Sequence, residues 1–103
     1  MKRAKRRYLL LQVDSEASLT GRELLDAVWA SVTKLYGEVG ASQTGLSLID
    51  YDEERKTAVL RVWLQAMQQV RASIASITRL AEKDAAVHVV AVSGTLKSLR
   101  EKT

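Results

Sequence analysis

Hydrophobic positions along this chain follow two different spacings, which divide the chain into strands and helices. Apolar residues are continuous or alternate over four short stretches, which predicts β-strands at residues 6–14, 44–51, 56–64 and 86–93. They recur every three or four positions over two longer stretches, which predicts helices at residues 20–37 and 65–82. A last short helix is expected at residues 96–101.

The first helix carries a clear start signal. Thr20 fits the N-cap position and Glu23 follows three residues later, which is the spacing of a capping box. Leu19 and Leu24 stand on either side of the cap as a candidate hydrophobic staple. Gly37 is expected to end the helix as a left-handed cap.

The predicted order βαββαβ, followed by a short helix, indicates one α+β domain over residues 1–103. Two right-handed βαβ units of this kind build an antiparallel sheet with two helices on one face, the ferredoxin-like (RRM-like) sandwich. Its usual strand order is 4-1-3-2, so the first and fourth strands are antiparallel neighbours. We therefore expect the N-terminal arm (residues 1–7) and the C-terminal helix (residues 94–103) to emerge at one edge.

Charge is unevenly distributed along the chain, whose net charge is +4. Five of the sixteen basic residues lie in the first seven positions, so residues 8–103 hold eleven basic residues against twelve acidic ones. A neutral body with a basic arm suggests a polyanionic partner, although a solubilising tail has the same composition. The basic residues expected to share the edge or to face outward beside it are Lys2, Arg3, Lys5, Arg6, Arg7, Arg61, Lys97 and Arg100.

The second face of the predicted sheet is also partly apolar, which is unusual for a solvated face. The terminal helix could cover it through Leu96 and Leu99, or a partner protein could, because large apolar patches rarely stay exposed. The residues predicted for this face, and for a protein interface on it, are Tyr8, Leu10, Val59, Trp63, Val90 and Val92.

Residues typical of reactive sites have simpler explanations here. The chain has no Cys and one His, so thiolate and histidine-rich metal sites are excluded, and His88 is expected to be structural. The acidic stretch of residues 50–54 is interpreted as a solvated turn rather than a magnesium site. Ser93 and Thr95 are expected in a turn and a cap, since no His is placed to activate them. We expect neither a metal site nor a catalytic residue.

Two RNA-binding patterns are present only in part. Residues 37–40 have the GxxG spelling of a KH loop, but Glu38 would repel phosphate, so a helix cap is favoured. The third strand stands where an RRM carries its stacking aromatic residues, but only Trp63 could stack.

The longest apolar run, residues 8–11, is too short to cross a bilayer, and the chain is expected to be cytoplasmic.

Several motifs together resemble the ribonuclease P protein component 2 family, of archaeal type and shared with eukaryotes. The most specific are the basic-Arg-Tyr opening (Lys5-Arg6-Arg7-Tyr8-Leu9) and the ending Val92-Ser93-Gly94-Thr95-Leu96-Lys97. The helix end at residues 35–40, the strand at 59–62 and Val70-Arg71 add weaker support. The resemblance covers nearly the whole chain.

The resemblance implies a non-catalytic subunit of ribonuclease P, the endoribonuclease that removes the 5′ leader of precursor tRNA. It implies binding to the catalytic RNA together with protein component 3, indirect contact with precursor tRNA, and pairing into a homodimer or heterotetramer. It implies no cofactor in this chain, because magnesium belongs to the catalytic RNA. The family's basic opening falls on Lys5, Arg6 and Arg7.

Two other classes of function stay open at this point, because this fold hosts many functions. One is a small-ligand regulatory domain, for which residues 37–45 form the only candidate loop. The other is an assembly scaffold that uses the apolar face and binds no nucleic acid.

Overall fold

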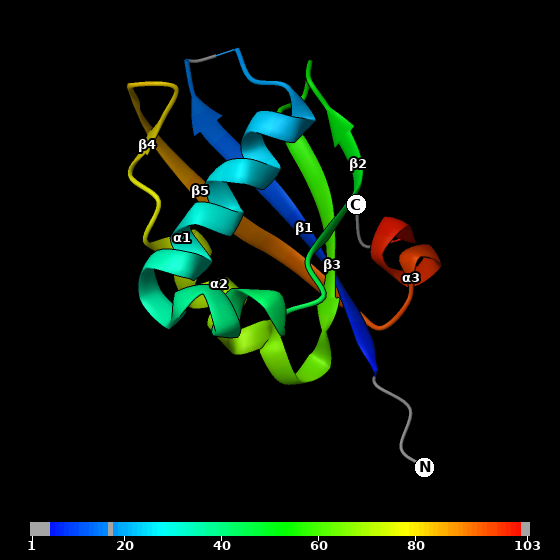
Figure 1. Cartoon of the computed structure of the whole chain (residues 1–103). Helices are drawn as coiled ribbons and strands as arrows, with labels where there is room; N and C mark the ends of the chain where they lie inside the picture. Colours follow the sequence, from blue (N-terminus) through cyan, green and yellow to red (C-terminus); the bar gives the residue numbers. More distant parts are fainter. Residues whose placement is uncertain (1–4, 17, 102–103) are drawn as a thin grey trace.

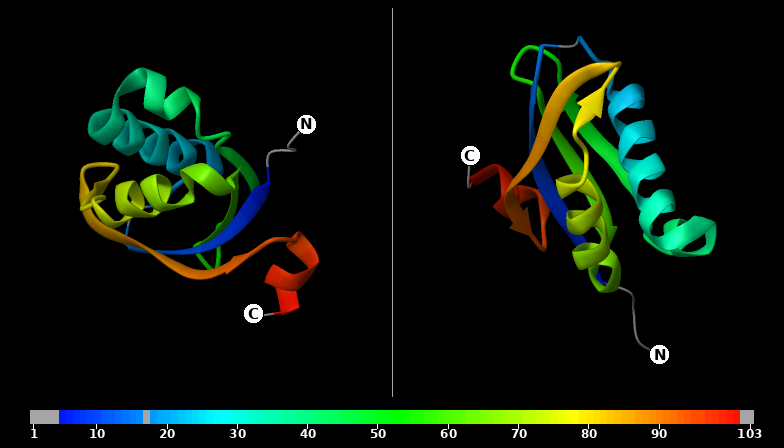
Figure 2. Two further views of the ribbon diagram at one scale, coloured as in Figure 1. Left: turned by 90° about the horizontal axis from the view of Figure 1, so that it is seen from below. Right: turned by 90° about the vertical axis from the view of Figure 1, so that its left-hand side faces the viewer.

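The computed structural model describes residues 5–16 and 18–101, which form a five-stranded antiparallel sheet and three α-helices (Figure 1). Helices α1 and α2 cover one face of the sheet, and α3 lies on the opposite face (Figure 2). The elements are β1 (Arg6–Ser15), α1 (Gly21–Ser42), β2 (Ser47–Asp52), β3 (Thr57–Trp63), the 3-10 turn η1 (Leu64–Ala66), α2 (Met67–Ala75), β4 (Arg79–Leu80), β5 (Lys83–Ser93) and α3 (Leu96–Glu101).

The sheet order is β2-β3-β1-β5-β4, with β1 in the centre. Leu9, Leu11 and Val13 of β1 face the helices and are buried, as expected for the middle strand of a two-layer sandwich. The order 4-1-3-2 predicted for four strands is found in β5-β1-β3-β2, but the prediction missed β4 at the edge. The confirmed part is therefore a mixed α/β fold with an antiparallel sheet, and the strand order differs in detail.

The second helix is much shorter than predicted. It ends at Ala75 instead of residue 82, and the chain then forms the hairpin of β4 and β5. Ile77 stays buried outside the helix, so its helical spacing after Val70 and Ile74 gave a false signal. The turn between the strands places Ala81 at φ 50° and Glu82 at φ 66°, a conformation that tertiary contacts must impose on residues with a side chain.

Helix α1 begins as the sequence predicts. The Thr20 side chain accepts a hydrogen bond from the Glu23 amide, and the Glu23 carboxylate accepts one from the Thr20 amide. The end was predicted wrongly, because Gly37 (φ 78°, ψ 171°) bends the helix and a further turn follows to Ser42. That turn carries Ala41 into the core, where it is fully buried.

A β-bulge in β5 changes which face its last residues occupy. Leu10 of β1 pairs with Ala91, whereas Leu11 pairs with Val89, so Val90 is an extra residue between them. Val92 consequently pairs with Leu9 and packs against the core. The prediction that Val92 lies on the outer face is therefore wrong, because one extra residue reverses the alternation of a strand.

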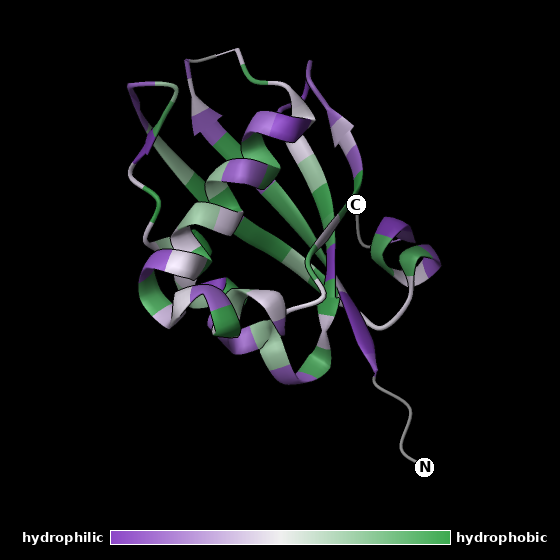
Figure 3. Cartoon of the chain, viewed as in Figure 1, coloured by the Kyte–Doolittle hydropathy of each residue, from purple (hydrophilic) through white to green (hydrophobic). Residues whose placement is uncertain are grey.

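Helix α3 has the predicted bounds and turns back over the outer face of the sheet, where it packs against β1 and β5. Leu99 is only 1% exposed there, and Val59 on the same face of β3 is 8% exposed. The apolar residues concentrate in the strands and on the inner sides of the helices, while the start of β1 is hydrophilic (Figure 3). No helix within residues 5–16 and 18–101 is long and apolar enough to cross a membrane.

Candidate nucleic-acid interface

The start of β1 and the end of β5 lie side by side at one end of the sheet. Tyr8 pairs with Ser93, and a Cβ atom on Gly94 would lie 3.4 Å from Arg7 Nη1. The predicted convergence of these two distant segments is thus confirmed by the strand register. The following helix α3 does not extend beyond the sheet but folds back across it (Figure 1).

We call Lys5, Arg6, Arg7, Arg61 and Lys97 the basic end. Arg6 pairs with Trp63 across β1 and β3, and Arg7 pairs with Val62. Lys5, Arg6 and Lys97 are exposed, whereas Arg7 and Arg61 are half-buried. Arg61 lies opposite Tyr8 on the outer face. Lys2 and Arg3 belong to residues outside those that the structure describes.

Within residues 5–16 and 18–101, no carboxylate lies at ion-pair distance from a charge of the basic end. The ion pairs found in the described part of the chain lie elsewhere, between Arg22 and Asp26 and between Arg55 and Asp52. Arg100 is exposed on α3 and has an interaction of its own, so we leave it out of the basic end. Several unneutralised cations at one end of a small domain produce a local positive field suited to phosphate groups.

Trp63 is fixed at the same end. The Arg6 guanidinium carbon lies 4.9 Å from the centre of the Trp63 ring, within cation–π distance. Gly45 (φ 65°) approaches the indole so closely that a Cβ atom there would be 2.5 Å from its ring nitrogen. The Lys5 carbonyl accepts a hydrogen bond of 2.7 Å from the Leu64 amide, which fixes the chain just before β1.

A cavity of about 450 Å³ adjoins Trp63. Its other lining residues are Gln43 after α1, Gln65 and Ala66 in η1, and Gln69 in α2. The three glutamine side chains are exposed and make no hydrogen bond to another described residue. Sequence analysis missed this cavity, because it forms only where residues 63–69, between β3 and α2, meet Gln43 after α1.

The structure places the residues predicted for a protein interface in different environments. Tyr8 and Leu10 are half-buried on the outer face, and Val90 is 56% exposed at the bulge. Val59 is buried, and Val92 faces the core. We call Tyr8, Leu10 and Val90 the apolar strip.

The remaining candidate positions show no arrangement for a reaction. The Asp52 carboxylate accepts hydrogen bonds from the Glu54 and Arg55 amides, as in a solvated turn. No group of three potential metal ligands occurs among residues 5–16 and 18–101. Burial raises the pKa of Tyr51, with smaller contributions from Glu53 and Glu23, but this tyrosine is on β2, away from the basic end.

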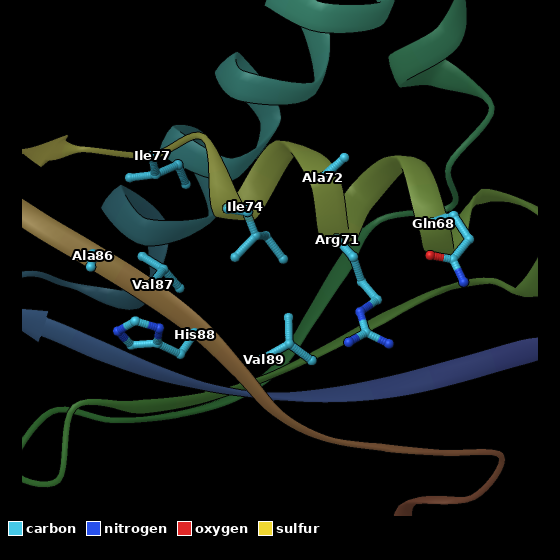
Figure 4. Close-up of a pocket in the computed structure, with 10 residues that line it drawn as sticks. Gln68, Arg71, Ala72, Ile74, Ile77, Ala86, Val87, His88 and Val89 are labelled. Atoms are coloured by element: carbon cyan, nitrogen blue, oxygen red, sulfur yellow. The ribbon is translucent and has the colours of Figure 1, made fainter.

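A groove of about 490 Å³ separates α2 from β5 (Figure 4). Ile74 and Ile77 face Val87 across it, while Arg71 lies towards its other end (Figure 4). His88 is exposed on β5 and pairs with Gln12. The groove contains no pair of groups suited to acid–base chemistry, and we assign no reaction to it.

The chain is similar to known proteins over nearly its whole length. Residues 7–103 match the model of the Rpp14/Pop5 family. The chain is 33% identical over 100 residues to ribonuclease P protein component 2 of Methanosarcina barkeri, covering 97% of this chain and 73% of that relative. It is 30% identical over 100 residues to the protein of the same name from Pyrococcus furiosus, covering 97% and 83%.

A solved structure shares the fold. The cryo-EM structure of yeast ribonuclease MRP contains a chain that matches with a TM-score of 0.76 and 14% identity, over 99% of this chain and 93% of that one. The resemblance predicted from the basic opening and the Val-Ser-Gly-Thr-Leu-Lys ending is confirmed, and the chain belongs to the Rpp14/Pop5 family.

Proposed function

We propose that this chain is a non-catalytic protein subunit of ribonuclease P, the ribonucleoprotein that removes the 5′ leader from precursor tRNA. Membership of the Rpp14/Pop5 family and the similarity to ribonuclease P protein component 2 support this assignment. The structural observation that carries it is the basic end, where cations without carboxylate partners gather at one end of the sheet. In this proposal the RNA carries the chemistry and its magnesium, and the reaction takes place in the cytoplasm.

The basic end would bind the catalytic RNA through its phosphates. Arg and Lys contacts to phosphates position a protein on a nucleic acid without reading its sequence, which suits a folded RNA. Lys5, Arg6 and Lys97 are exposed for such contacts, and the partners of Arg6 and Arg7 in β3 hold them at fixed positions. Lys2, Arg3 and Arg100 remain proposed RNA contacts from the sequence.

The apolar strip would receive ribonuclease P protein component 3. Val90 is exposed in the middle of an outer face that α3 covers only in part, and Tyr8 and Leu10 continue the apolar surface beside it. This pairing would bring the chain into a heterotetramer, or into a homodimer without component 3, and contact with precursor tRNA would be indirect. Light scattering of the chain with and without component 3 measures these assemblies.

Reconstitution tests the proposed function. Catalytic RNA and component 3 are assayed for precursor-tRNA cleavage at moderate magnesium, with and without this chain. We expect the chain to raise the cleavage rate by stabilising the active RNA fold. A rate that does not change on addition would reject the proposal, and an effect that persists without salt-dependent RNA binding would favour a scaffold.

A further inference from the structure

We propose that the cavity beside Trp63 is a binding site for one unpaired nucleobase of the RNA. This inference rests on the proposed function and extends it, because it adds a base contact to a surface otherwise argued only for phosphates. The cavity is lined by an aromatic ring and three carboxamide side chains, and Arg6 of the basic end lies over that ring. These are the groups that bind a single-stranded nucleotide, namely a stacking surface, hydrogen-bonding amides and a cation for the phosphate.

The size and composition of the cavity fit a base better than a peptide. About 450 Å³ at the end of the sheet is enough for a nucleobase, and its walls are polar except for Trp63 and Ala66. The side chains of Gln43, Gln65 and Gln69 have both donors and acceptors, and none of these side chains is hydrogen-bonded to another described residue. Carboxamides therefore remain available for the edge of a base.

Arg6 links the base site to the phosphates. Its guanidinium lies over the Trp63 ring, but the arginine is exposed, and an exposed cation–π contact is weaker than the stacking of a base on an aromatic ring. A nucleotide entering the site can therefore replace Arg6 on the ring, while Arg6 moves to the adjacent phosphate. Gly45 keeps the indole in place during this exchange, because its backbone lies against the ring.

The two tryptophans of the chain make this proposal measurable. Trp29 lies on α1 and is 42% exposed, so a Trp29→Phe variant leaves Trp63 as the only indole. This variant is titrated with a ten-nucleotide oligoadenylate and with an abasic oligomer of equal length and phosphate number. We expect the oligoadenylate to quench Trp63 fluorescence and to bind about tenfold more tightly than the abasic oligomer.

Substitutions of the glutamines separate the base site from general electrostatics. We expect Gln65→Ala together with Gln69→Ala to weaken oligoadenylate binding about fivefold and to leave abasic binding unchanged. Gln68→Ala is the matched control. Gln68 is an exposed glutamine of α2, like Gln69, but it lines the groove beside β5 and not the cavity beside Trp63. Equal binding of both oligomers without quenching would overturn the base site and leave the proposed function standing. If neither oligomer and no catalytic RNA binds, both the base site and the proposed function are rejected.

Discussion

At the scale of single residues, the contact between Gly45 and Trp63 decides the structure of the basic end. Gly45 adopts φ 65°, which disfavours any residue with a side chain, and its backbone lies against the indole. Trp63 in turn lies under Arg6, so one glycine positions both an aromatic ring and a cation. The sequence contains no signal for this contact, because the two residues are eighteen positions apart.

We expect Gly45→Ala to lower the free energy of unfolding by about 2–3 kcal/mol, because the new methyl group meets a rigid ring and the backbone conformation is strained. Gly37→Ala is the control, since Gly37 also has a positive φ (78°) but nothing lies within 4 Å of its Cβ position. Urea unfolding measures both variants. An equal loss of stability in Gly45→Ala and Gly37→Ala would show that the contact with the indole does not contribute to stability.

Tyr51 provides a prediction for alkaline pH. Because burial raises the pKa of Tyr51 above its ordinary value of 10.0, the folded chain holds the phenol proton more tightly than the unfolded chain does. The free energy of unfolding should therefore fall as the pH rises above about 10. Tyr51→Phe should remove this part of the decline. Unfolding curves measured between neutral and alkaline pH compare the two chains.

At the scale of elements, α3 serves as the cover of the outer face. It has six residues, which is too short for a stable isolated helix, so its stability depends on packing. Leu99 supplies that packing and is almost completely buried. The sequence predicted the bounds of α3 and offered its packing over the outer face, through Leu96 and Leu99, as one of two alternatives. It could not choose between them, because it does not show how far the Ser93–Thr95 turn reverses the chain.

Leu99→Ala should cost about 2–3 kcal/mol of stability, as for other large-to-small changes in a packed site. Lys97→Ala on the exposed side of the same helix should change stability by less than about 0.5 kcal/mol. Thermal unfolding and the binding of a hydrophobic dye report the loss and the exposure of the outer face. If Leu99→Ala behaves like Lys97→Ala, α3 does not cover that face in solution.

At the scale of the whole molecule, the basic end and the apolar strip adjoin on the outer face of the sheet. Tyr8 of the apolar strip pairs with Arg61 of the basic end, while Val90 lies at the bulge, away from the start of β1. The two proposed partners, RNA and protein, would therefore bind adjoining surfaces of one small domain. Substitutions at the start of β1 and at Val90 should affect them independently.

Replacing Lys5, Arg6 and Arg7 by glutamine should reduce the slope of log affinity against log salt by about 2–3, because three phosphate contacts are lost. Substitution is preferable to truncation, since β1 already begins at Arg6. The control replaces Lys34, Arg79 and Lys83, which are exposed, the last two in the β4–β5 hairpin at the edge of the sheet, and alters net charge equally. Filter binding to the catalytic RNA over a range of salt gives both slopes. If the variant of Lys5, Arg6 and Arg7 and the control variant give identical slopes, the basic end does not bind the RNA.

Val90→Glu should weaken the affinity for component 3 at least tenfold while leaving RNA affinity unchanged, because a charge in an apolar interface must be desolvated. Val39→Glu is the control, at a position on α1 that is 72% exposed and on the helical side of the sheet. Calorimetric titration with component 3 distinguishes them. If Val90→Glu binds component 3 as tightly as the unsubstituted chain does, the interface does not include Val90.

The sequence predicted local features well and long-range features less well. The capping box at Thr20, the bounds of α3 and the strands β1, β2, β3 and β5 follow from spacing over a few residues. The β4–β5 hairpin was missed because Ile74 and Ile77 are spaced as in a helix, although tertiary packing decides that segment. The glutamine-lined cavity was missed because only the tertiary fold brings Gln43 to residues 63–69.

The bulge at Val90 makes the length of β5 critical. Inserting one residue after it would exchange the inward and outward positions of the strand's last residues, placing Ala91 where Val92 fills the core. It would also reverse the side on which the chain leaves the sheet towards α3. The β4–β5 turn at Ala81 and Glu82 should accept extra residues far more easily. A library of insertions and deletions is therefore expected to show few tolerated changes at the end of β5 and many in this turn.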